Sequence, residues 1–142
     1  MTTVQSGSPR QSSSPRTAAL ALAADAACIL VFIAIGRRNH GEGVTLAGIA
    51  QTAWPFLTGL VAGWLLSRAW RQPTAVRTGA MVWPVTIAIG IGIRAATGTG
   101  IAASFIVVAT LVTGALLMGW RAALAGLAGR KGAGRKGAGR KG

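Results

Sequence analysis

Four long apolar stretches, separated by short polar segments, constrain the fold of this chain more than any other feature. They span about residues 17–35, 48–66, 79–97 and 101–120. About 20 apolar residues in a helix cross the hydrocarbon core of a bilayer, which is roughly 30 Å thick. Helices are expected because strands with open edges would leave backbone polar groups unpaired in lipid. The sequence therefore predicts an all-α integral membrane protein, a four-helix bundle formed by residues 17–121.

The composition argues against several other classes of protein. The 142 residues are 51% hydrophobic and 12% charged, whereas soluble domains carry about 25% charged residues. The net charge of +13 is typical of nucleic-acid-binding domains, but such domains are not this apolar, so we do not expect a nucleic-acid partner. One cysteine and one histidine leave no disulfide framework and no metal cluster. With no catalytic triad, phosphate-binding loop or carboxylate pair, we expect no enzyme activity and no cofactor.

The two ends of the chain differ in composition from the apolar middle. Residues 1–16 are rich in serine and contain two prolines, which predicts a disordered polar leader. Residues 122–142 end in a Gly-Arg-Lys-Gly-Ala repeat that begins at Gly129, and a repeat without apolar side chains larger than alanine cannot pack. We predict a disordered basic tail. Three interpretations of it stay open: a repeat expansion without function, contact with anionic inner-leaflet lipids, and binding of nucleic acid.

The distribution of basic residues predicts how the bundle is oriented. Four spans place the leader, the connection between the second and third spans and the tail on one side, which holds twelve of the fifteen Lys and Arg residues. The other side holds Arg37, Arg38 and Arg94. Positively charged segments stay inside, so both termini are expected in the cytoplasm. Four tryptophans near span ends are expected to be interfacial anchors: Trp54, Trp70, Trp83 and Trp120.

Asp25 is the one acidic residue inside a predicted span. It lies about 12 Å from the start of that span, and acids at such depth usually face the bundle interior or a water-filled path. Either it exchanges protons, or it is a packing residue hydrogen-bonded to another helix. Depth counts place Thr58, Thr86 and Thr110 at a similar height. They predict a polar layer around Asp25, although each hydroxyl can instead bond the backbone of its own helix.

A second polar layer is predicted nearer the opposite face of the membrane. Gln51, Thr52, Arg94 and Ser104 lie at similar heights, roughly 21–24 Å up by the same count. An ion pair between Arg94 and Asp25 would have to bridge about 10 Å vertically. The favoured interpretation of Arg94 is therefore a side chain that extends outward to the interface.

Small residues at four-residue spacing predict close helix contacts. Gly59 and Gly63 form a GxxxG pattern in the second span, and Ala88 and Gly92 repeat the spacing in the third. Such faces let helix backbones approach one another. The contacts lie either within the bundle or between two subunits, which leaves a homodimer open.

Several short motifs resemble a known family. Asp25 is followed by Gly-Arg-Arg-Asn-His at 36–40, Trp-Pro-Phe at 54–56 and Gly-Trp at 63–64. Gly90 through Arg94, Ser104-Phe105 and Gly119-Trp120-Arg121 resemble later motifs of the same family. Over residues 18–121 the chain resembles a bacterial membrane family called domain of unknown function 3054. The resemblance implies a small integral protein of the bacterial inner (plasma) membrane. Its motif residues here are Asp25, Arg37, His40, Pro55, Phe56, Arg94 and Arg121.

Because Arg37 and His40 fall in a motif, they join the predicted outer polar layer. Two functions then remain open. The first is a proton-linked transporter or channel for a small solute, using Asp25. Small multidrug exporters also have four spans with one acid in the first, but this chain has no tyrosine and lacks their aromatic box, so the analogy is architectural. The second is a non-transporting interaction or scaffold protein whose basic tail contacts lipid.

Overall fold

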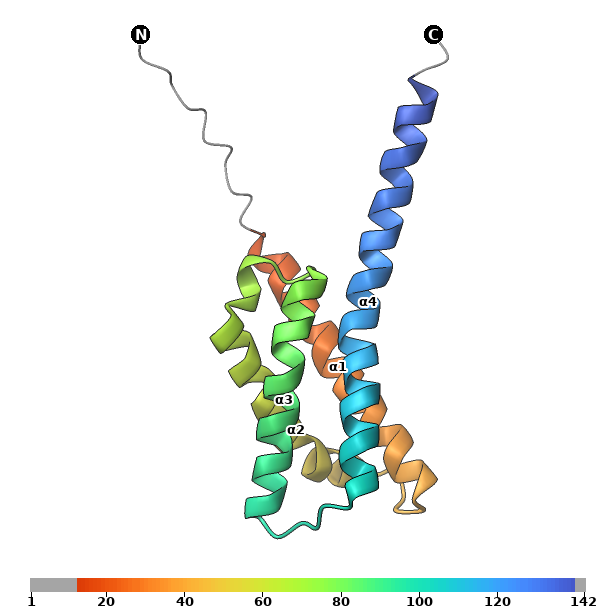
Figure 1. The fold of residues 1–142 in the computed structure, drawn as a ribbon. Helices are drawn as coiled ribbons and strands as arrows, with labels where there is room; N and C mark the ends of the chain where they lie inside the picture. The colour runs from red at the N-terminus through yellow and green to blue at the C-terminus, as the bar shows by residue number, and fades with distance from the viewer. Residues whose placement is uncertain (1–12, 140–142) are drawn as a thin grey trace, which may run out of the picture.

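A computed structural model describes residues 13–139, and this part of the chain folds into four α-helices without strands. The helices are α1 (Pro15–Asn39), α2 (Leu46–Ser67), α3 (Val76–Ala96) and α4 (Ala103–Ala138), and a short 3-10 helix, η1 (Ala69–Arg71), follows α2 (Figure 1). All four α-helices are long and apolar enough to cross a membrane. The predicted all-α membrane bundle is confirmed.

Local signals in the sequence set where the helices begin and turn. The Ser14 side chain accepts a hydrogen bond from the Thr17 backbone N–H at 3.2 Å, and a proline follows at the first helical position of α1. Thr45 caps α2 in the same way, accepting from the Gly48 N–H at 3.1 Å. At the end of α2, Arg68 adopts the left-handed conformation with φ 52°, which turns the chain into η1.

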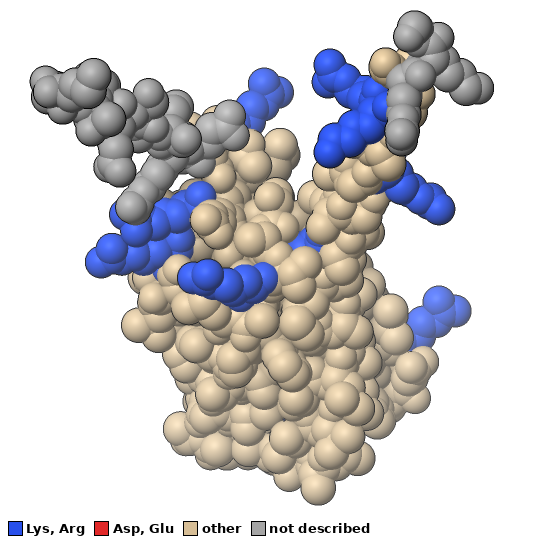
Figure 2. Space-filling model, turned by 45° about the horizontal axis from the view of Figure 1, so that its top comes forward, with Lys and Arg blue, Asp and Glu red and all other residues tan. Residues whose placement is uncertain are grey.

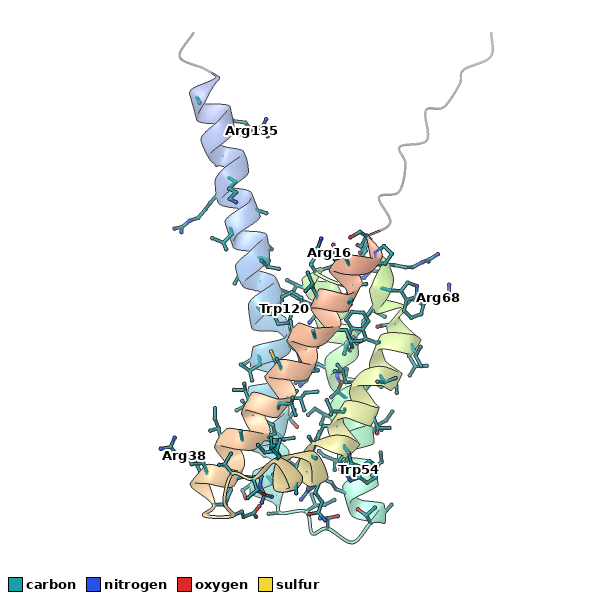
Figure 3. The ribbon with its side chains drawn as sticks, turned by 180° about the vertical axis from the view of Figure 1, so that it is seen from behind. Arg16, Arg38, Trp54, Arg68, Trp120 and Arg135 are labelled. Atoms are coloured by element: carbon teal, nitrogen blue, oxygen red, sulfur yellow. The ribbon has the colours of Figure 1, made fainter. Side chains whose placement is uncertain are left out.

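The helices run alternately up and down, so α1 begins and α4 ends at the same end of the bundle (Figure 1). Each helix packs against two others: α1 contacts α2 and α4, and α3 also contacts α2 and α4. The end at which α1 begins and α4 ends is called the basic end below. Arg16, Arg68 and Arg135 lie toward it, whereas Arg38 and Trp54 lie at the opposite end (Figure 3). Figure 2 shows Lys and Arg gathered toward the basic end, with no acidic side chain visible on that face.

The GxxxG pattern of α2 packs against the backbone of α3. A Cβ atom at Gly59 would lie 2.5 Å from the Thr86 carbonyl oxygen, and one at Gly63 would lie 3.0 Å from that of Val82. Only glycine permits this approach. The corresponding pair on α3 behaves differently, because Ala88 and Gly92 are exposed and a Cβ at Gly92 would meet nothing within 4 Å. The predicted contact at Ala88 and Gly92 does not occur within the described chain.

An apolar core fills the bundle, and apolar side chains also cover its outside. Phe105 packs beside Phe32 and Phe56, with ring centroids 6.4 and 6.1 Å away. On the outside, Leu20, Leu66 and Leu111 are 65%, 73% and 64% exposed. A soluble protein rarely exposes so much continuous apolar surface, whereas the hydrocarbon of a bilayer solvates it.

Helix α4 continues to Ala138, well past the predicted span 101–120. The sequence predicted disorder over 122–142, and the structure differs over 122–138, where the chain is helical and exposed. A helix that is already formed extends at the cost of fixing one residue per added hydrogen bond, and Ala, Leu, Arg and Lys favour it. Residues 140–142 of the tail and 1–12 of the predicted leader lie outside the described residues. Pro15 and Arg16 of the leader belong to α1.

Candidate functional site

Asp25 on α1 and Arg121 on α4 form a buried ion pair. The Arg121 Nη1 donates to Oδ1 of Asp25 and Nη2 donates to Oδ2, both at 2.7 Å. Neither side chain is exposed to any degree. Two parallel charge-assisted hydrogen bonds form the strongest geometry available to a guanidinium and a carboxylate. The pair therefore ties the first helix of the bundle to the last.

Two tryptophans complete the surroundings of the carboxylate. The indole N–H of Trp64 on α2 donates to Oδ2 of Asp25, and that of Trp120 on α4 donates to Oδ1, both at 2.9 Å. Each carboxylate oxygen thus accepts one hydrogen bond from the guanidinium and one from an indole. A buried charge is tolerated only when it is paired and hydrogen-bonded in this way.

Arg121 is equally well satisfied. Its Nε donates to the Pro73 carbonyl at 2.9 Å, and Nη1 also donates to the Leu117 carbonyl at 2.7 Å. Its guanidinium carbon lies 4.4 Å from the centroid of the Trp120 ring, a cation–π distance. The Pro73 carbonyl belongs to the connection between η1 and α3. The ion pair, Trp64 and Trp120 are called the Asp25 network below, and they join α1, α2, α4 and this connection.

A glycine on α3 leaves room for the arginine. A Cβ atom at Gly79 would lie 3.2 Å from Cδ of Arg121 and 3.1 Å from the Leu117 carbonyl oxygen. On α1, Asp25 lies on the same helical face as the buried Ala21 and Ile29, each one turn away. The carboxylate therefore points into the bundle because its helix presents that face to the core.

The predicted threonine layer does not form around Asp25. Each hydroxyl donates to the carbonyl four residues earlier on its own helix, Thr58 to Trp54 at 2.8 Å, Thr86 to Val82 at 2.9 Å and Thr110 to Ile106 at 2.7 Å. Thr86 is buried, whereas Thr58 is exposed. Because a threonine on a helix can satisfy its hydroxyl locally, it does not need a partner on another helix.

The charged partner of Asp25 is Arg121 rather than Arg94. Arg94 donates through Nη2 to the Thr99 carbonyl at 3.2 Å and lies 4.8 Å from the centroid of the Phe105 ring. The predicted bounds of the fourth span placed Arg121 just after it, where it counted only as a cytoplasmic charge. The same bounds assigned Trp120 to the interface. Their place in a Gly-Trp-Arg motif was the signal that could have identified both.

The predicted outer polar layer is formed only in part. Arg37 Nη1 donates to the Thr52 hydroxyl at 3.1 Å and to Oε2 of Glu42 at 3.0 Å, and Arg37 also binds two carbonyls of the loop after α1. The other three predicted members are exposed, and their side chains form no hydrogen bond within residues 13–139: His40, Gln51 and Ser104. The structure joins Arg37 to Thr52 and leaves these three side chains on the outside of the bundle.

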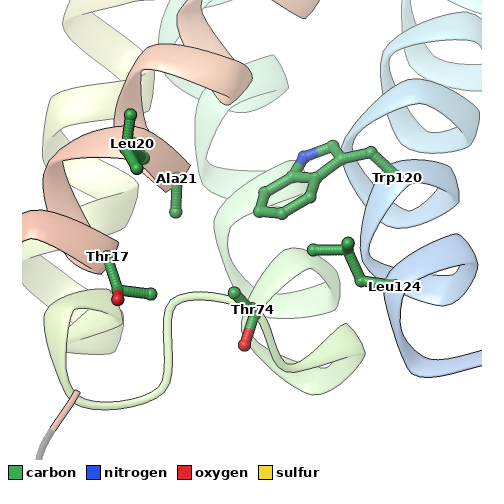
Figure 4. Close-up of a pocket in the computed structure, with 6 residues that line it drawn as sticks. All are labelled: Thr17, Leu20, Ala21, Thr74, Trp120 and Leu124. Atoms are coloured by element: carbon green, nitrogen blue, oxygen red, sulfur yellow. The ribbon is translucent and has the colours of Figure 1, made fainter. Parts of the chain in front are cut away.

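A small open pocket lies beside the Asp25 network. Its volume is about 220 Å³, and its lining comes from α1, α4 and the connection before α3: Thr17, Leu20, Ala21, Thr74, Trp120 and Leu124 (Figure 4). The Trp120 ring extends into the space between Ala21 and Leu124 (Figure 4). One indole therefore both holds the carboxylate and forms part of a wall that is open to the outside.

The comparison with protein families finds one match. The model of the family described as "Protein of unknown function (DUF3054)" matches residues 22–124. This range contains all four members of the Asp25 network. No curated protein and no solved structure matches the chain significantly.

Proposed function

We propose that this chain, which belongs to the family described as protein of unknown function DUF3054, is a proton-linked transporter or channel for a small solute. In this proposal Asp25 is the group that gains and loses the proton. The observation that supports it is the fully buried Asp25–Arg121 pair, on which three helices and a connection converge. An ionisable group at membrane depth, shared by several elements, is suited to couple protonation to movement of helices.

Stability alone is a weak reason for such a pair. Removing two charges from water costs several kcal/mol per ion, and well-packed apolar side chains of similar volume often stabilise a protein as well or better. Such a costly network is better explained if the charge of one member, Asp25, changes during function.

Protonation of Asp25 supplies the proposed switch. It would remove the negative charge that compensates Arg121 in a region of low dielectric, where an unpaired guanidinium is strongly unfavourable. Arg121 would then move toward water at the nearby basic end and release α4 from α1. In this proposal the state with the pair formed is the closed state.

A second candidate is a non-transporting interaction or scaffold protein in the membrane. All the acceptor positions of the Asp25 carboxylate are engaged, as in a static lock between helices. The exposed basic extension of α4 would then contact anionic lipid or a partner.

The orientation and location stay part of the proposal. The excess of Lys and Arg toward the basic end favours that end, and both termini with it, on the cytoplasmic side of a bacterial inner membrane.

Cys28 provides the experiment that separates the two candidates. It lies three residues from Asp25 on α1, is partly buried, and is the only thiol. A small maleimide is applied to intact membranes at neutral and acidic pH, to the native protein and to Asp25→Asn. Because maleimide reacts with the thiolate, each rate is divided by that of a free thiol at the same pH. For a transporter we expect the normalised labelling to be faster at acidic pH, and fast at both pH values in the variant, which imitates the protonated acid.

The labelling of Glu42→Gln, at the opposite end, serves as the matched control and should follow the native protein. Complete protection of Cys28 in the native protein and in Asp25→Asn at both pH values would reject the transport proposal and favour the scaffold. A flux assay in proteoliposomes across a pH gradient then identifies the solute.

A further inference from the structure

A second pocket lies at the basic end, on the other side of the α2–α3 connection. Its volume is about 210 Å³, and three arginines line it, Arg68 at the end of α2, Arg71 in η1 and Arg77 in the first turn of α3. Gln72 and Thr78 also contribute to the lining. The left-handed turn at Arg68 leads the chain into η1, and the three arginines from α2, η1 and α3 meet around one hollow.

This chain has no acidic side chain left to neutralise these arginines. It contains two acidic residues. Asp25 is paired with Arg121, and Glu42 is paired with Arg37. Arg37 is the neighbour of Arg38, which lies at the opposite end of the bundle (Figure 3). The three arginines are exposed, so water and salt screen the repulsion between their guanidinium groups, but an anion between them would lower it further. Such an anion would come from outside the side chains of this protein.

The surroundings of the pocket place it at the level of lipid headgroups. Trp70, between Arg68 and Arg71, is 44% exposed, and tryptophan is enriched at the membrane–water interface. Beside the arginines, Leu66 and Met81 are 73% and 46% exposed, as expected for side chains in contact with lipid. The pocket thus lies where apolar surface meets positive charge.

We propose that this pocket binds the phosphate group of an anionic phospholipid. A guanidinium presents two parallel N–H donors that match two phosphate oxygens, so three arginines can surround one phosphate. Basic pockets between membrane helices on the cytoplasmic side bind anionic headgroups by this chemistry. The lipid tails would lie along the exposed apolar side chains of α2 and α3. This site does not depend on the proposed transport through Asp25.

The test measures binding of a fluorescent phosphatidylglycerol to the purified full chain in neutral detergent, by anisotropy. Measurements are made in about 1 M salt, where the Debye length is about 3 Å, so that only direct contacts persist. The triple variant Arg68→Gln, Arg71→Gln, Arg77→Gln should bind roughly 10- to 100-fold more weakly. The matched control replaces Arg130, Lys131 and Arg135 with glutamine, which removes the same charge from the exposed part of α4. It should stay within about twofold of the native protein.

Competition distinguishes the sources of phosphate. Unlabelled phosphatidylglycerol should displace the probe, whereas phosphatidylcholine and inorganic phosphate at the same concentration should not. Displacement by inorganic phosphate would overturn the assignment to lipid, and equal losses in the two triple variants would overturn the pocket. If the first triple variant fails to fold, the single variant Arg71→Gln carries the same test and should weaken binding severalfold. Unchanged binding in that variant would contradict the proposal.

Discussion

Replacing Arg121 with methionine should strongly destabilise the bundle, and replacing Asp25 as well should add little further cost. Methionine fills much of the same space but leaves the Asp25 carboxylate buried with only two indole donors, 2.9 Å away. Removing one partner of a buried pair costs about 3–5 kcal/mol, because the other charge stays uncompensated. The double variant Asp25→Leu, Arg121→Met leaves no buried charge, but it frees the indole N–H groups of Trp64 and Trp120, so it should cost about as much as Arg121→Met alone and much less than the two single losses added together.

The assay is a double-mutant cycle on the free energy of unfolding, measured in detergent micelles with a denaturant. The coupling energy between Asp25 and Arg121 should be at least about 2–3 kcal/mol, near the upper limit for residues in direct contact. The pair Arg37–Glu42 is the matched control, because its N–O distance is 3.0 Å but its side chains are 16% and 58% exposed. Its cycle should give about 0.2–1 kcal/mol.

Two results would refute this reasoning. A coupling energy for Asp25–Arg121 as small as that of Arg37–Glu42 would mean that water reaches the buried pair. Single variants Asp25→Leu and Arg121→Met that barely lower the free energy of unfolding would mean that packing around the side chains, rather than their charge, holds α1 to α4.

The other predictions concern the indole donors, the glycine contact and the helical tail. Trp120→Phe removes one N–H donor to a charged acceptor and should lower the free energy of unfolding by about 1.5–3 kcal/mol, whereas no change would mean that the remaining donors suffice. Gly59→Ala places a methyl against the α3 backbone and should reduce the melting temperature in detergent, whereas Gly92→Ala, in open space, should not. Deleting residues 129–142 should reduce the helical signal in circular dichroism without changing the melting temperature. An unchanged helical signal would contradict the extension of α4 seen here.

The sequence predicted the number and type of elements because that information is local. Each apolar run is long enough to cross a bilayer, and each polar break contains residues that end or cap a helix, such as Thr45 before α2. The predictions were less accurate at the end of α4, where glycines recur but no proline stops the helix. Helix propensity and the length of an apolar run identify a membrane-spanning helix. They do not give the residue at which the helix ends, because a helix that is already formed extends easily.

The partners of Asp25 were predicted poorly for a geometric reason. The depth count assumed upright helices that all start at one plane, whereas α1 runs obliquely behind α4 in Figure 1. Tilt changes which residues share a height. The count also made no statement on rotation, and each residue step turns a side chain by about 100° around the axis. Thr58 was counted at the height of Asp25, but its side chain is exposed. Arg121 was counted as a charge at the end of its span, but its side chain contacts Asp25.

By itself the sequence determined that this protein crosses a membrane four times, that its basic residues gather at one end, and that one carboxylate lies inside the bundle. These properties depend on the composition of segments, which a chain carries whatever its tertiary contacts. Only the tertiary structure decided that the carboxylate meets Arg121, Trp64 and Trp120, and that Arg68, Arg71 and Arg77 surround one pocket. Those contacts depend on how each helix is tilted and rotated, and packing between helices sets both.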